Sequence, residues 1–252
     1  ILILPGLFGS KQNWKSISKS LCKKLDTKIC ALDLRNHGDS PHSDVHDYDS
    51  MADDVSYFVK KHGWDKVTLI GHSMGGKVSI NLALNPNLNS ILDRLIIVDM
   101  APVRQSTTLS SGFRSYVDAM KKVSQSKVSG TVEADKILAE SIPSVEVRQF
   151  LLTNLKKDSN GKYDFRINLE ALGKSLPLLW DLPYQNSSEP PVYNKSVLFI
   201  AGGKSHYVTE YMHPTIRKLF PSAQIITIPD AGHWVHAEKP DEFIKTVVNY
   251  IQ

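Results

Sequence analysis

The chain has 252 residues, of which 41% are hydrophobic and 22% are charged, and it contains two cysteines. At roughly 150 residues per domain, this length allows one large domain or two small ones, and the composition excludes a disordered chain, a collagen and a disulfide scaffold. Thirty basic side chains against 26 acidic ones give a formal net charge of +4. Because the lysines are spread along the chain, we expect no nucleic-acid partner.

Short apolar runs alternate with helical patterns along much of the sequence, which is typical of βαβ units and a parallel sheet. Strands are expected over residues 1–4, 29–32, 67–70, 95–98, 197–201 and 224–228. Helices are expected over residues 14–25, 50–62, 77–84, 210–220 and 241–251. From residue 102 to about 194, helical segments and polar loops replace this rhythm. A structureless loop of that length is improbable, so we predict an α/β sheet interrupted by a helical insertion.

Cysteine usage and hydropathy indicate neither a disulfide-linked nor a membrane-spanning protein. Cys22 and Cys30 have no partner cluster, so we expect two reduced and mostly buried thiols of an intracellular protein. No apolar run approaches the roughly 20 residues of a transmembrane helix. The chain begins without a methionine inside the apolar run of residues 1–4, and we expect any targeting sequence to lie upstream.

The segment Gly71-His72-Ser73-Met74-Gly75 lies between an expected strand and an expected helix. It matches Gly-x-Ser-x-Gly, the nucleophile elbow, in which a sharp turn lifts the serine hydroxyl above the sheet and glycines relieve the crowding of the backbone. We therefore interpret Ser73 as a nucleophile.

The same segment nearly matches a phosphate-binding loop, Gly-x4-Gly-Lys-[Ser/Thr], through Gly71, Gly76 and Lys77. That loop needs a hydroxyl directly after the lysine to bind Mg²⁺, but Val78 stands there, and Ser79 lies about 100° further around a helix. A nucleotide hydrolase and a non-catalytic binding module with a silent turn remain rival hypotheses.

A serine hydroxyl is a weak nucleophile unless a base takes its proton and a third group orients the base. His233 follows the last expected strand, where the elbow motif places its histidine, and we prefer it to His206 and His236. The usual acid position, residues 202–206, contains no carboxylate. We therefore expect Asp99, after the strand that follows the elbow helix, to be the acid, with a turn-capping role as the alternative.

The oxyanion formed by attack on a carbonyl needs two preorganised N–H donors. We expect one from the backbone of Met74 and the other from the backbone of Leu7, in the loop Pro5-Gly6-Leu7-Phe8-Gly9. Further along, Phe8, Trp180 and Trp234 are candidates for the lining of an acyl pocket. The His- and Asp-rich stretch of residues 37–49, where His42 and His46 would share a helix face, is expected to be a polar loop and to bind no metal.

These motifs, with Asp33-Leu34-Arg35-Asn36-His37-Gly38-Asp39-Ser40-Pro41 and Gly232-His233-Trp234-Val235-His236, resemble α/β-hydrolases of the abhydrolase type. The resemblance is to the group that includes fungal mitochondrial ethanol acetyltransferases and related animal and bacterial esterases. It implies the triad Ser73, Asp99 and His233, and a lid formed by the insertion. Pro5 departs from the histidine usual there, and the hairpin that usually precedes the first strand is absent, so we expect an upstream portion.

The predicted architecture is an α/β-hydrolase core of residues 1–102 and 195–252 with a helical lid of residues 103–194. The predicted activity is acyl transfer through an acyl-serine, either from acetyl-CoA to ethanol with accompanying esterase and thioesterase activity, or to water as a plain esterase, thioesterase or lipase-like enzyme. We expect no cofactor and no metal, small-molecule esters or thioesters with an alcohol or water as partners, and a monomer. The resemblance implies a mitochondrial location; the cytoplasm is the alternative.

Overall fold

The computed structural model describes residues 1–104, 107–181, 184 and 189–252, which form two compact units. The first unit comprises Ile1–Leu34, Tyr48–Arg104 and Leu182–Gln252, and the second comprises Arg35–Asp47 and Gln105–Asp181. This division differs from the expected one because Arg35–Asp47 joins the insertion. The backbone N–H of Asn168 donates to the carbonyl oxygen of Asn36 (3.1 Å), and its side chain donates to the Asn36 side chain (3.1 Å).

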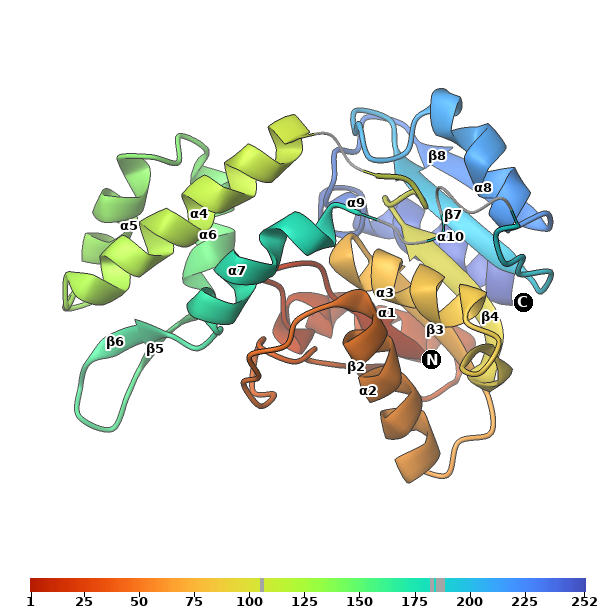
Figure 1. Ribbon diagram of the computed structural model, residues 1–252, viewed down its shortest axis with the longest axis horizontal. Helices are drawn as coiled ribbons and strands as arrows, with labels where there is room; N and C mark the ends of the chain where they lie inside the picture. Colours follow the sequence, from red (N-terminus) through yellow and green to blue (C-terminus); the bar gives the residue numbers. More distant parts are fainter. Residues whose placement is uncertain (105–106, 182–183, 185–188) are drawn as a thin grey trace. The chain divides into compact units, whose positions relative to one another are not determined.

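The first unit is built around a six-stranded parallel sheet (Figure 1). Its strands, in spatial order, are β2 (Cys30–Ala31), β1 (Leu2–Leu4), β3 (Val67–His72), β4 (Leu92–Val98), β7 (Val197–Gly202) and β8 (Ala223–Ile228). The inner strands are mostly apolar, as is typical of strands whose two faces are both covered. All six strands expected from the sequence are present, and β1 lies inside the sheet between β2 and β3.

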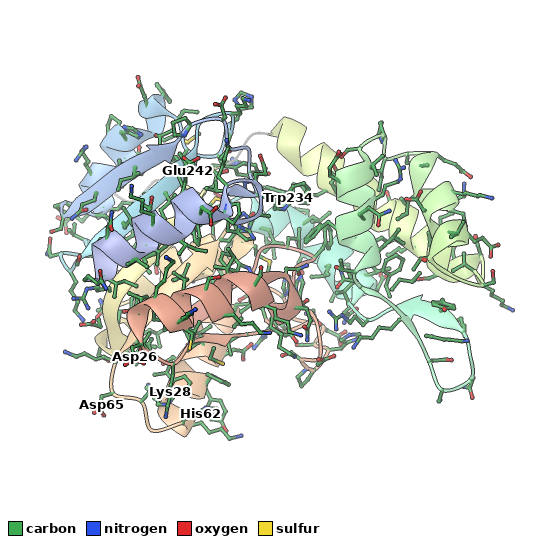
Figure 2. All side chains as sticks on the ribbon, turned by 180° about the vertical axis from the view of Figure 1, so that it is seen from behind. Asp26, Lys28, His62, Asp65, Trp234 and Glu242 are labelled. Atoms are coloured by element: carbon green, nitrogen blue, oxygen red, sulfur yellow. The ribbon has the colours of Figure 1, made fainter. Side chains whose placement is uncertain are left out.

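Helices cover both faces of this sheet. They are η1 (Lys11–Trp14), α1 (Lys15–Leu25), α2 (Tyr48–Lys61), α3 (Met74–Leu84), η2 (Asn89–Ile91), η3 (Glu210–Met212), α8 (His213–Leu219), α9 (Val235–Glu238) and α10 (Pro240–Ile251). Helices α2, α3 and α8 lie on the face toward the viewer in Figure 1, and α1 and α10 lie on the face toward the viewer in Figure 2. An α/β-hydrolase-like arrangement of a parallel sheet flanked by helices is thus confirmed.

The core on the α1 side is a continuous apolar cluster. Trp14, Ile17 and Leu21 repeat at helical spacing, and all three are buried against side chains of α10 and the sheet. The strand residues in this cluster are Ile3, Ile70, Ile96, Val98, Leu198, Ile200 and Ile228. Cys22 follows Leu21 and therefore points out to solvent, and Cys30 is partly exposed, so the expectation of mostly buried thiols was wrong.

The second unit is mainly helical, as expected for the insertion, but it also contains an antiparallel hairpin. Its elements are α4 (Thr107–Gln125), α5 (Thr131–Ala139), α6 (Val145–Leu152), β5 (Leu155–Lys157), β6 (Tyr163–Phe165) and α7 (Leu169–Leu179). A partly buried ion pair between Arg148 Nε and Asp135 Oδ1 (2.8 Å) joins α6 to α5. Leu138, Leu151 and Leu172 are fully buried in this unit.

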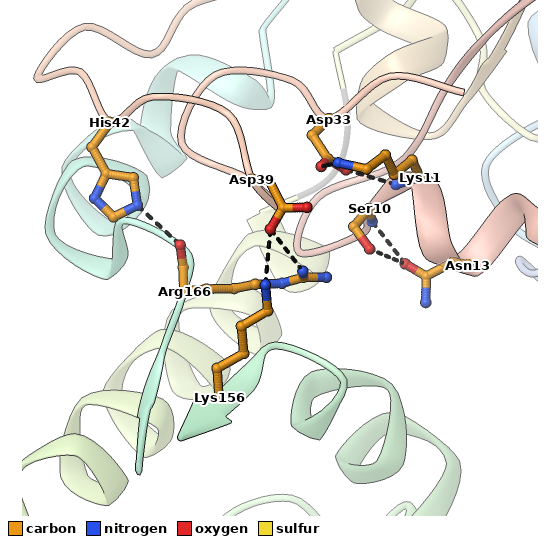
Figure 3. A network of polar contacts seen from close by, with 8 residues as sticks. All are labelled: Ser10, Lys11, Asn13, Asp33, Asp39, His42, Lys156 and Arg166. Atoms are coloured by element: carbon orange, nitrogen blue, oxygen red, sulfur yellow. Dashed lines mark hydrogen bonds and ion pairs between the residues drawn. The ribbon is translucent and has the colours of Figure 1, made fainter. Parts of the chain in front are cut away.

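The segment of residues 35–47 is a loop attached to the hairpin. The Asp39 carboxylate accepts from Lys156 Nζ (2.8 Å) and Arg166 Nη1 (3.4 Å), and His42 Nε2 lies 2.9 Å from the carbonyl oxygen of Arg166 (Figure 3). The stretch expected to be a polar loop is a loop up to Asp47, so His42 and His46 lie on no helix, and His46 is buried beside Asn36. Across the described ranges, no helix is both long and apolar enough to span a bilayer.

Replacing Leu21 with alanine is expected to destabilise the first unit, because the side chain is fully buried in the apolar cluster. We expect a loss of about 2–5 kcal/mol in the free energy of unfolding, measured by urea denaturation. Lys19→Ala, on the exposed face of the same helix, is the control and should change this free energy by less than about 0.5 kcal/mol. Equal losses in the two variants would contradict the packing described for α1.

Candidate active site

The turn at Ser73 joins β3 to α3 in a strained conformation. Ser73 has φ 53° and ψ −117°, a region that costs a residue with a Cβ about 1–3 kcal/mol. Its N–H donates to the carbonyl oxygen of Val98 on β4 (3.1 Å), which ties the turn to the neighbouring strand. The strain holds the serine at the point where the strand reverses into the helix.

Two glycines make this turn possible by close approach. A Cβ on Gly75 would lie 2.3 Å from the carbonyl oxygen of Leu4, and a Cβ on Gly71 would lie 2.3 Å from the carbonyl oxygen of Gly75. No side chain fits at such distances, because the obstructing atoms are backbone. The glycines of the sequence motif therefore let α3 begin directly against β1.

Three side chains from distant parts of the chain form a hydrogen-bonded series at this turn. His233 Nε2 lies 2.9 Å from Ser73 Oγ, and His233 Nδ1 lies 2.7 Å from Asp99 Oδ2. Asp99 is fully buried, whereas the His233 side chain is 22% exposed. The three residues singled out in the sequence thus lie within hydrogen-bond distance of one another, each at the carboxyl end of a strand or in the loop that follows it.

Asp99 is held by donors from the strand and loop beside it. Its Oδ1 accepts from the backbone N–H of Gly202 (3.0 Å), and its Oδ2 accepts from the Ser205 hydroxyl as well as from His233. Residues 202–206 lack a carboxylate, but Ser205 in this segment turns toward Asp99, a contact that was not expected from the sequence. The signal available was a hydroxyl at the position where an acid was expected.

The loop that carries His233 is fixed by two residues, Glu238 and Tyr207, that the sequence motifs do not point to. The Glu238 carboxylate accepts from the N–H groups of Gly232 (2.7 Å) and Trp234 (3.1 Å), on either side of the histidine. The Tyr207 ring stacks on the imidazole of His233, with centroids 3.9 Å apart. Asp230 points away and pairs with Lys204 (3.0 Å).

The loop between β1 and η1 lies against the nucleophile. A Cβ on Gly6 would lie 3.1 Å from Ser73 Cβ, so this backbone lies close to the side chain of Ser73. Phe8 in the same loop has φ 63°. In the described part of the chain, the N–H groups of Leu7 and Met74 donate to no protein acceptor. Both donors therefore remain available to an oxyanion.

Polar contacts of Asp33, Lys11, Ser10 and Asn13 anchor this loop, although Pro5 stands where a histidine is usual. The carboxylate of Asp33, after β2, accepts from the backbone N–H of Lys11 (2.7 Å) and also from its ammonium group (Figure 3). The Ser10 N–H donates to Asn13 Oδ1 (2.7 Å), and the Gly9 N–H donates to the carbonyl oxygen of Gly6 (2.9 Å). Backbone turns and one carboxylate thus fix the loop.

The residues expected to line an acyl pocket fall in different units. Phe8 is buried and Trp234 partly buried in the first unit. Trp180 belongs to the second unit, where its ring lies 5.1 Å from that of Phe113. Their pocket role stays a prediction. The described residues include no group of three or more histidine, cysteine or acidic side chains arranged to hold a metal ion.

Two further histidines are buried beneath the site. His72 Nε2 lies 2.9 Å from the carbonyl oxygen of His233, and the His236 ring stacks on Trp14 with centroids 3.9 Å apart. Burial, with a smaller contribution from His233, lowers the pKa of His236 to about 3, and burial together with His236 and His233 lowers the pKa of His72 well below 6.5. Both rings are therefore neutral at physiological pH, and His72 donates to the His233 backbone.

A family model described as "alpha/beta hydrolase fold" matches residues 1–240. The chain belongs to this family. The sn-1-specific diacylglycerol lipase ABHD11 of Danio rerio is 40% identical over 260 residues, covering 100% of this chain and 78% of the relative. The Probable alcohol acetyltransferase of Saccharomyces cerevisiae is 40% identical over 272 residues, covering 100% and 77%. Esterase YbfF of Escherichia coli is 34% identical over 253 residues, covering 100% and 92%.

A solved structure, "Marine microorganism esterase", superposes on this α/β-hydrolase with a TM-score of 0.90 at 33% identity, covering 99% of this chain and 94% of that one. The family and the esterase and lipase names of its relatives identify the chain as an enzyme of the serine-hydrolase type. Its activity belongs to the hydrolase and esterase class, and small-molecule esters fit that class.

Acid is expected to destabilise this hydrolase through its buried histidines. Because the pKa of His236 is about 3 in the folded chain and 6.5 in the unfolded one, the unfolded chain binds the proton first as pH falls. Stability is therefore lost below pH 6.5, by up to about 1.4 kcal/mol per pH unit for each such histidine. His236→Phe should lose about 2 kcal/mol less than the unmodified chain between pH 6.5 and 4.5, measured by urea denaturation. Parallel pH curves for the two proteins would contradict this account.

Proposed function

We propose that this enzyme cleaves carboxylic esters through an acyl-serine formed on Ser73. The observation that carries the proposal is the hydrogen-bonded series from Ser73 Oγ to His233 (2.9 Å) and from His233 to Asp99 (2.7 Å). A serine beside a base that is itself oriented by a buried carboxylate is the arrangement that activates a hydroxyl for attack on a carbonyl.

In the first half-reaction, Ser73 Oγ attacks the ester carbonyl carbon as its proton passes to His233 Nε2. The negative charge that develops on the carbonyl oxygen is stabilised by the N–H groups of Leu7 and Met74. The tetrahedral intermediate then breaks its bond to the alcohol oxygen, which takes the proton from His233. Asp99 accepts the Nδ1–H of His233 throughout, which fixes the tautomer and stabilises the imidazolium.

In the second half-reaction, water attacks the acyl-serine, His233 takes a proton from the water, and the Ser73 oxygen leaves with that proton. The products are a carboxylic acid and the free enzyme. The scheme needs no cofactor or metal, because each proton moves between His233 and a reacting oxygen. Ser205 is assigned a positioning role, since its hydroxyl shares Asp99 Oδ2 with His233 and limits rotation of the carboxylate.

A second candidate function is acyl transfer to an alcohol. It is favoured by the 40% identity to the Probable alcohol acetyltransferase of Saccharomyces cerevisiae, which extends over the whole chain. Acetyl-CoA would donate the acyl group to Ser73, and ethanol would take the place of water and give ethyl acetate. The same three side chains serve both reactions, so the acceptor depends on how well the acyl-serine is shielded from water.

A mitochondrial location and a monomeric state complete the proposal. The location rests on the resemblance to mitochondrial members of the family. It is tested by fractionation of the source cells with an antibody against this chain, and light scattering tests the monomer.

Replacing Ser73 with alanine is expected to lower kcat for p-nitrophenyl acetate by at least about 10⁴-fold, because no acyl-enzyme can form. The assay also offers acetyl-CoA, with and without ethanol, and separates acetate from ethyl acetate by gas chromatography. Ethyl acetate in excess over acetate would select the transferase. Full activity of the variant, or turnover of ATP but of neither ester nor thioester, would refute the acyl-serine.

The two neighbours of His233 are expected to differ in their effects on kcat. Asp99→Asn should lower kcat by about 10⁴-fold, since the amide favours the wrong tautomer of the imidazole. Ser205→Ala should lower kcat about 10- to 100-fold, the value of one hydrogen bond to a charged group. Asp230→Asn is the matched control, because this exposed carboxylate pairs with Lys204, and its kcat should stay within about twofold of the unmodified enzyme. A large loss in Asp230→Asn with none in Asp99→Asn would reverse the assignment of the acid.

A further inference from the structure

The excess positive charge of this protein resides in one segment, although basic residues occur throughout the chain. Residues 15–28, which comprise α1 and the turn after it, contain five lysines and one aspartate, a net charge of +4. This equals the formal net charge of the whole chain, so the remaining 25 basic and 25 acidic side chains balance. The lysines are Lys15, Lys19, Lys23, Lys24 and Lys28.

All five lysines are exposed, and within the described residues none of their ammonium groups is paired with a carboxylate. Lys15, Lys19 and Lys23 recur every four residues and so form a stripe about 12 Å long on the solvent side of α1. Figure 2 shows this helix on the outer face of the first unit, with Asp26 and Lys28 at its C-terminal end. By contrast, Lys11, just before the helix, is paired with Asp33.

The fold does not account for this stripe. The apolar face of α1 supplies its packing, and a cation stabilises a helix only near the C-terminus, where Lys23 and Lys24 lie. Lys15, Lys19 and Lys23 place like charges four residues apart, which disfavours the helix, and the first turn of α1 has no acidic residue to offset them. The stripe therefore has a cost in stability and calls for a ligand of opposite charge.

We propose that the lysine stripe of α1 docks this enzyme on anionic phospholipid surfaces. Five ammonium groups on α1 and the turn after it match a diffuse layer of phosphates, and each lysine near such a surface contributes about fivefold to the binding constant. The segment presents no exposed aromatic ring for stacking on bases and no arginine for bidentate contacts, which disfavours a nucleic acid.

The docking is electrostatic and reversible, because the apolar residues of α1 face the core and none is free to enter the bilayer. Trp14, which directly precedes the stripe, stacks on His236 and lies 6.2 Å from His72 between ring centroids. The N-terminal end of the stripe thus adjoins the layer beneath the active site, so docking brings the ester-cleaving site to a lipid surface.

The test is sedimentation with vesicles of phosphatidylcholine that contain about 30% phosphatidylserine. This anionic lipid gives the vesicles a strong negative surface potential. Ser73→Ala serves as the background, so that the result is independent of the proposed catalysis. We expect binding at low salt, a steep loss on addition of salt, and no binding to pure phosphatidylcholine. The triple variant Lys15→Glu, Lys19→Glu and Lys23→Glu should bind at least about 100-fold more weakly.

The matched control is Lys60→Glu, Lys61→Glu and Lys66→Glu, which alters net charge equally at three exposed lysines elsewhere in the first unit. It should bind within about threefold of the parent. Circular dichroism shows whether both triple variants are folded. The same triple variants made with Ser73 intact should also hydrolyse p-nitrophenyl acetate at an unchanged rate. Absence of binding by the parent, equal losses in both triples, or tighter α1-dependent binding to duplex DNA than to the vesicles would overturn the proposal.

Discussion

The site depends on one constraint, the left-handed turn of Ser73 between β3 and α3. The strain at φ 53° is maintained because the carbonyls of Leu4 and Pro5 press against Gly75 and the Val98 carbonyl accepts the serine N–H. Phe8, Asp99 and Asp230, in the loops around the serine, also have positive φ. Such strain persists only where the surrounding structure over-determines it, and here the parallel sheet supplies that support.

Burial of polar groups is the second requirement of this arrangement. Asp99 has no contact with solvent, and it is kept there by donors from Gly202, Ser205 and His233. Below the site, His72 remains neutral and donates to the backbone that carries His233. His72 therefore contributes both to the position of His233 and to the acid sensitivity of the fold.

The two faces of α1 illustrate how one helix serves two purposes. Its inner face contributes Ile17 and Leu21 to the core, and its outer face holds the excess charge of the molecule. Because apolar packing already supplies the stability of the helix, the outer residues are free to meet the requirements of a ligand. Charge and packing can therefore vary independently along this segment.

The sequence by itself determined the parallel sheet and the residues singled out for catalysis. The spacing of apolar residues and the Gly-x-Ser-x-Gly turn are local patterns, so they can be recognised without knowledge of the tertiary structure. It also led to Asp99, through the lack of a carboxylate in residues 202–206. Only the tertiary structure revealed Ser205, Tyr207 and Glu238 around His233, since these contacts join loops distant in sequence. It likewise overturned the buried position expected for Cys22, because solvent exposure follows from packing that no short pattern records.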